Sequence, residues 1–63
     1  MKTVHVDSNW HHMDKGLLIY HPEGIKDGET IRGIHDNDEW IGTARAFLDE
    51  QGILFWYLEL PIT

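Results

Sequence analysis

Residues 36–52 have the sequence DNDEWIGTARAFLDEQG, and the fold class depends on whether they form a helix or one strand of a β-hairpin. A helix would carry an apolar stripe at the spacing of three and four residues that is typical of helices packed on a sheet: Trp40, Ile41, Ala44, Phe47 and Leu48. Asp36 can cap its first turn, and Glu39 would complete a capping box. Gly52 suits the left-handed position that follows a last turn. This pattern favours the helix.

Two features of the same stretch favour a strand. Gly42 lies at its centre, where glycine costs a helix about 1 kcal/mol relative to alanine. Residues 49–52 resemble a four-residue hairpin loop, which would set small side chains opposite large ones: Ala44 facing Tyr57, and Ala46 facing Phe55. We therefore expect a helix over about residues 37–51, with the hairpin as the alternative.

Residues 53–60, ILFWYLEL, predict a strand that is apolar on both faces, as in the centre of a sheet. We expect Leu54 and Leu58 to be buried on one face. If the monomer leaves the other face uncovered, Phe55 and Tyr57 become an aromatic patch of the kind that marks interaction surfaces.

Three shorter strands are predicted before residue 36, over 2–6, 17–20 and 30–34. The dipeptide Asp27-Gly28 is a hairpin signal, because it accepts positive φ at both central turn positions. The prediction is an α+β fold, in which an antiparallel sheet of three to four strands packs against one helix. The alternative is an all-β meander of five strands that closes into a small barrel. Sixty-three residues allow only a single domain, 1–63.

The composition excludes several classes of protein. Eleven Asp and Glu against five Lys and Arg give a net charge of -6, which opposes direct binding to nucleic-acid phosphates. The chain has no cysteine, and a small domain without disulfides is typical of a reducing compartment, so we expect a cytoplasmic protein. No apolar run approaches the 18 residues that a membrane helix needs, so we expect no membrane association.

Catalysis and metal binding are weakly supported. A chain of this length has little volume for a dry cleft between two catalytic groups, so we expect no enzyme, no catalytic residues and no cofactor. The metal alternative rests on five imidazoles and carboxylates near the N-terminus, a ligand set that suits zinc: His5, Asp7, His11, His12 and Asp14. None of the histidine pairs has the HExxH spacing, so we expect solvated imidazoles instead.

The uneven acidity points to a protein partner with a basic surface. Residues 29–50 contain six acids and two arginines, a net charge of -4. We expect a non-enzymatic protein–protein interaction module that has apolar anchors inside an acidic rim. The candidate anchors are Trp40, Phe55 and Tyr57, and the candidate rim is Asp36, Asp38 and Glu39.

Base rates for small, acidic, cysteine-free chains suggest a phage or mobile-element inhibitor that masks a host factor. Two other functions stay open besides metal binding. One is an acidic nucleic-acid mimic that occupies a basic groove, although -6 is sparse beside the charge density of duplex DNA. The other is a homo-oligomer that buries Phe55 and Tyr57 between copies.

Overall fold

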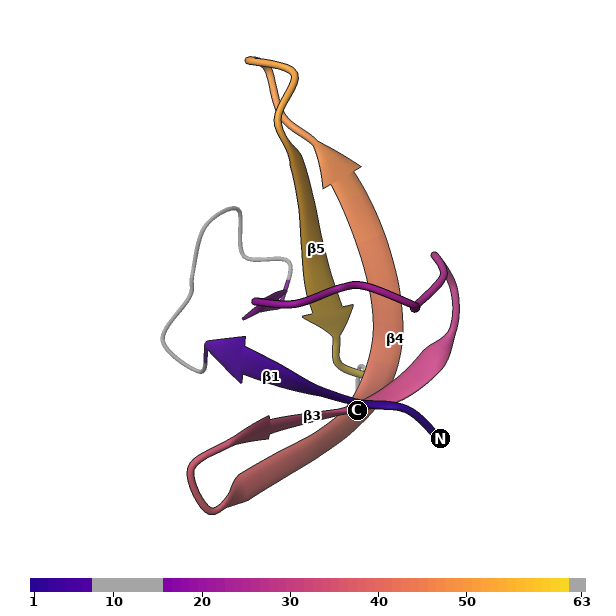
Figure 1. Ribbon diagram of the computed structural model, residues 1–63, viewed down its shortest axis with the longest axis vertical. Helices are drawn as coiled ribbons and strands as arrows, with labels where there is room; N and C mark the ends of the chain where they lie inside the picture. Colours follow the sequence, from indigo (N-terminus) through magenta and orange to yellow (C-terminus); the bar gives the residue numbers. More distant parts are fainter. Residues whose placement is uncertain (8–15, 62–63) are drawn as a thin grey trace.

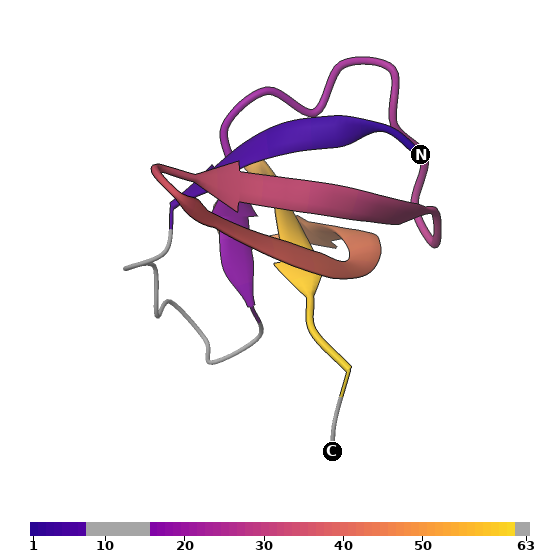
Figure 2. The same cartoon turned by 90° about the horizontal axis from the view of Figure 1, so that it is seen from below.

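The computed structural model describes residues 1–7 and 16–61, and these residues form five strands and no helix. The strands are β1 (Thr3–Asp7), β2 (Leu17–Ile19), β3 (Thr30–His35), β4 (Asp38–Leu48) and β5 (Leu54–Glu59). They close into a barrel in the order β1-β2-β5-β4-β3 (Figure 1; Figure 2). The helix predicted over 37–51 is wrong, and so is the α+β class. The alternative, a small five-stranded barrel, is confirmed.

Small inward-facing residues explain why β4 resembles a helix in sequence. Its barrel-facing positions include Gly42 and Ala44, which are buried, and Ala46 continues the same side of the strand where it is exposed. A Cβ atom on Gly42 would lie 2.4 Å from the backbone oxygen of Glu59 and 3.1 Å from Cδ1 of Leu58. The narrow interior excludes large side chains here, so the alternation of large apolar residues that identifies a strand is missing.

The β4–β5 hairpin pairs one residue away from the predicted register. Ala44 lies opposite Leu58 and Ala46 opposite Trp56, because five residues, 49–53, separate the paired strands. Asp49 organises this loop: its amide donates to the Ile53 oxygen at 3.0 Å, and its carboxylate accepts from the amides of Gln51 and Ile53 at 2.9 and 2.8 Å. A slip of one residue moves every side chain to the other face, and Leu58 therefore shares the inward face with Ala44.

The strand order is not that of a meander. β1 runs parallel to β3, with Val4 paired to Gly33, and β2 lies between β1 and β5. The Asp27-Gly28 turn therefore does not join paired strands, although Gly28 has the expected positive φ of 89°. It lies along β4 instead: the Gly28 amide donates to the Ala44 oxygen at 2.7 Å, and the Asp27 carboxylate accepts from the Ala46 amide at 3.1 Å.

Leu58 fills the centre of the barrel and is fully buried, as expected. Glycines make room for it, since a Cβ atom on Gly33 would come within 2.7 Å of Cδ2 of Leu58 and 2.9 Å of Cγ1 of Val6. The other core residues come from the four remaining strands: Val4, Val6, Ile19, Ile31 and Ala44. The expected burial of Leu54 is wrong, because this side chain is 56% exposed.

The hairpin of β4 and β5 continues past the barrel, and we call residues 46–56 the arm. β3 pairs with β4 only as far as Thr43, and β2 pairs with β5 only at Tyr57 and Leu58. β2 then leaves β5 to follow β1, where the Tyr20 amide donates to the His5 oxygen at 3.0 Å. The arm therefore projects from the barrel along the long axis of the molecule (Figure 1).

Candidate interaction surface

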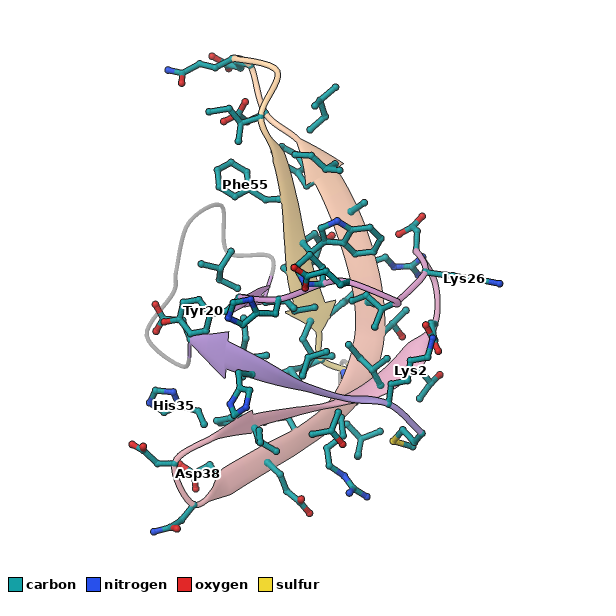
Figure 3. The ribbon with its side chains drawn as sticks, in the orientation of Figure 1. Lys2, Tyr20, Lys26, His35, Asp38 and Phe55 are labelled. Atoms are coloured by element: carbon teal, nitrogen blue, oxygen red, sulfur yellow. The ribbon has the colours of Figure 1, made fainter. Side chains whose placement is uncertain are left out.

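The predicted acidic rim lies at the end of the molecule opposite the arm. Asp36 and Asn37 form the two-residue loop between the paired residues His35 and Asp38, and Asp36 has a left-handed φ of 52°. Glu39 follows on β4. Figure 3 shows Asp38 at this end of the molecule and Phe55 on the arm, toward the opposite end. The rim is thus a contiguous set of acids on the β3–β4 turn.

The predicted anchors occupy two other environments. Trp40 is partly buried on the inward side of β4 and packs against the core. Phe55 and Tyr57 lie on the outward side of β5, where Phe55 is paired with Phe47 and Tyr57 with Arg45. The six predicted residues are therefore not one patch, because the acids sit on the β3–β4 turn and the outward aromatics on and next to the arm.

The arm gathers aliphatic residues that the sequence analysis did not select. Leu48, Leu54 and Ile53 are 63%, 56% and 49% exposed. Leu48 and Leu54 face each other across the hairpin, on the side that points into the barrel lower down. Trp56, half-buried against the core, continues this face toward the barrel. Of the six large apolar residues most exposed among those described, these three cluster at the outer end of the hairpin, and Leu48 and Leu54 share one face of it.

Ion pairs neutralise most of the described basic residues. Lys2 contacts Glu29 at 3.6 Å, and Arg32 contacts Glu39 at 3.7 Å. Arg45 contacts Glu59 at 3.4 Å. Among residues 1–7 and 16–61, Lys26 is the one lysine or arginine without a carboxylate at ion-pair distance.

Lys26 lies at the base of the arm, next to the Asp27-Gly28 turn that is bonded to β4, and its side chain points outward (Figure 3). The other end of the arm is acidic. Residues 46–56 contain no lysine or arginine, and their charged residues are Asp49 and Glu50 at the tip. The Asp49 carboxylate is bonded within the loop, whereas Glu50 is exposed. The arm therefore has a cation at its base, aliphatic residues along its length and a carboxylate at its tip.

The metal alternative falls largely on residues that the structure does not describe. His5 and Asp7 lie on one face of β1, as expected from their spacing, but His11, His12 and Asp14 lie outside the described residues. Within the described part of the chain, no three metal-ligating side chains come together.

Two other titratable side chains lie near the end of β1. The His35 ring approaches the Val6 oxygen through Nδ1 at 3.0 Å and the Asp36 carboxylate through Nε2 at 3.5 Å. Reduced hydration, followed by the charge of Asp7 and a hydrogen bond to it, raises the pKa of the Tyr20 phenol above its ordinary value. These contacts link strands of the barrel, away from the arm.

Comparisons of this chain with protein families, with curated proteins and with solved structures found no match. None of the described residues belongs to a helix that is long and apolar enough to cross a membrane.

Proposed function

We propose that this chain is a non-enzymatic protein–protein interaction module and that the arm is its contact surface. The observation that carries the proposal is the clustering of exposed Leu48, Ile53 and Leu54 at one end of the molecule. A short chain has few large aliphatic residues to spare from its core. A cluster of them on a projecting hairpin is what an interaction surface requires, because partner contact removes apolar area from water.

Charge narrows the chemistry of the partner. Glu50 and Asp49 give the arm tip a negative charge, while its faces are apolar. Such an arrangement fits a partner surface with an apolar centre and a cation near its edge, where the acids guide encounter and the aliphatic residues supply affinity.

Photo-crosslinking in cells of the source organism tests the proposal. A benzoylphenylalanine at position 54 should give a covalent adduct with a protein, whereas the same residue at Thr30, which is exposed on the barrel wall, should not. Adding Leu48→Asp to the Leu54-labelled chain should remove the adduct. The matched control is Ile41→Asp, at an apolar barrel residue that is 44% exposed and should not affect it.

Two results would contradict the proposal. One is equal labelling from positions 54 and 30, which indicates chance collision. The other is no protein adduct from position 54 while circular dichroism shows that the chain is folded. Mass spectrometry of the adduct identifies the protein that lies on the arm.

A further inference from the structure

We infer that the protein on the arm is a second copy of this chain, with two arms packed antiparallel so that each tip lies against the base of the other arm. This inference rests on the proposed function and specifies its partner. Three features of each copy support this inference. Lys26 lies at the base of the arm (Figure 3), Glu50 lies at its tip, and the apolar face of the arm lies between them.

The apolar face is suited to self-association about a two-fold axis. Leu48 and Leu54 are directly opposed across the hairpin, so their side chains form a small ridge on one face. In a symmetric dimer the same patch contacts itself. Two such faces can pack at the roughly 10 Å spacing of stacked sheets, where each arm covers the leucines of the other.

The charges are complementary only when the arms are antiparallel. Lys26 lies beside the level of Ala44 and Ala46, which bond the Asp27-Gly28 turn next to it. Glu50 lies in the loop, four residues beyond Ala46, at most roughly 13 Å along the chain. When two arms run in opposite directions, Glu50 of each copy comes to the base of the other arm, where Lys26 lies. Parallel arms would instead place the two acidic tips together.

The aliphatic contact provides the driving force, and the ion pairs select the orientation. The net charge of -6 on each copy opposes association at long range. At physiological ionic strength this repulsion is screened over about 8 Å, so it acts weakly between whole molecules while contacting side chains still interact. Self-association should therefore be measured at physiological ionic strength.

Sedimentation equilibrium of the purified full chain is the first test. The parent should approach twice the 7.4 kDa chain mass as its concentration rises. Leu54→Asp should remain at the monomer mass, because it buries a charge in the centre of the contact. Ile41→Asp should dimerise like the parent, since Ile41 lies on the barrel wall. A parent that stays monomeric up to millimolar concentration overturns the inference, and so does a dimer that Leu54→Asp leaves intact.

A charge-reversal experiment tests the antiparallel arrangement itself. Lys26→Glu and Glu50→Lys should each weaken self-association by roughly tenfold, because every dimer then contains two like-charge contacts. An equimolar mixture of these two variants should dimerise as well as the parent, because each contact in the mixed dimer again joins opposite charges. No contact within one chain could give this rescue. Failure of the mixture to recover overturns the antiparallel pairing.

The two proposals fail in different ways. If position 54 cross-links to a different protein while the purified chain is monomeric, the arm is still an interaction surface and only the second copy is excluded. If position 54 gives no adduct and the chain is monomeric, both proposals fall. A second copy recovered in the adduct, together with the charge-reversal rescue, supports both.

Discussion

Leu58 and Leu54 lie on the same face of β5, four positions apart, yet Leu58 is fully buried and Leu54 is 56% exposed. The difference comes from the neighbouring strands. At Leu58, β2 and β4 flank β5, and the barrel closes over the side chain. At Leu54, only β4 is paired with β5 among the described strands. Alternation along a strand therefore determines which way a side chain points, while the lengths of the adjacent strands determine whether it is covered.

The two regions should consequently contribute differently to stability. The barrel encloses a single core to which all five strands contribute. The arm is a two-stranded ribbon, and an isolated ribbon of this kind is marginally stable in water. We expect the free energy of unfolding to depend on the barrel, and the arm to act on binding. The following predictions test this division, and they are best measured in dilute solution, where self-association contributes least.

The largest contrast is expected between Leu58→Ala and Leu54→Ala. Removing the Leu58 side chain leaves a cavity in the core, which should lower the free energy of unfolding by about 2–5 kcal/mol. Leu54→Ala removes a largely exposed side chain and should change it by about 0.5 kcal/mol or less. Urea denaturation of the two variants beside the parent measures both values. Equal losses would show that arm and barrel unfold as one packed unit.

Glycine substitutions sharpen the same comparison at the backbone. Gly42→Ala should lower the free energy of unfolding by about 3 kcal/mol. The new Cβ atom would meet the Glu59 backbone oxygen, which cannot move without opening the barrel. Gly52→Ala has open space around the new methyl group but a φ of 81°, so about 1 kcal/mol of left-handed strain is expected.

Hydrogen exchange distinguishes these two effects. Gly42→Ala should accelerate exchange of amides throughout the barrel. Gly52→Ala should accelerate only those of the arm. If Gly52→Ala also accelerates exchange of the barrel amides, the arm does not open independently of the barrel.

The smallest effect is expected from alkaline pH, acting at β1 and β2. The folded chain holds the Tyr20 proton more tightly than the unfolded chain, because the pKa of Tyr20 is raised. This contribution to stability is therefore present below the ordinary phenol pKa and is lost as pH rises through the raised value. Between neutral and alkaline pH, the denaturation midpoint should fall less for Tyr20→Phe than for the parent. An identical alkaline loss in both proteins would remove Tyr20 as its source.

The sequence predicted strand positions well and strand neighbours poorly. Strands expected over 2–6, 17–20, 30–34 and 53–60 occur within one residue at each end. The apolar stripe of residues 40–48 predicted a helix, and Gly42 was the main signal against it. The inward face of β4 has small residues because of Leu58, which is distant in the sequence, so the strand lacks the usual alternation of large apolar side chains. A single sequence shows the local conformational preference of β4, but it does not show how much room the neighbouring strands leave for its side chains.

The candidate surface shows the same limit. Phe55 was selected from the strand pattern, and it does lie on the projecting part of β5. Leu54 was assigned to the core, because nothing in the sequence reveals that β2 pairs with only two residues of β5. The acids of residues 36–39 lie at the β3–β4 turn, whereas Phe55 and Tyr57 lie on the outward side of β5. The exposed aliphatic patch could be recognised only from the pairing of strands.

The strand order also bears on how the chain is made. The β3–β4 and β4–β5 hairpins join near neighbours in sequence, whereas β1 pairs Val4 with Gly33 and β2 pairs Leu17 with Leu58. Closing long loops costs more conformational entropy, so the two hairpins should form first and β1 and β2 should join them late. During translation, however, β1 and β2 leave the ribosome first. β1 can pair with β2 and β3 as they emerge, whereas β2 and β4 must wait for β5. The barrel therefore stays open, and its core residues stay exposed to chaperones and to misassociation, until β5 has left the ribosome.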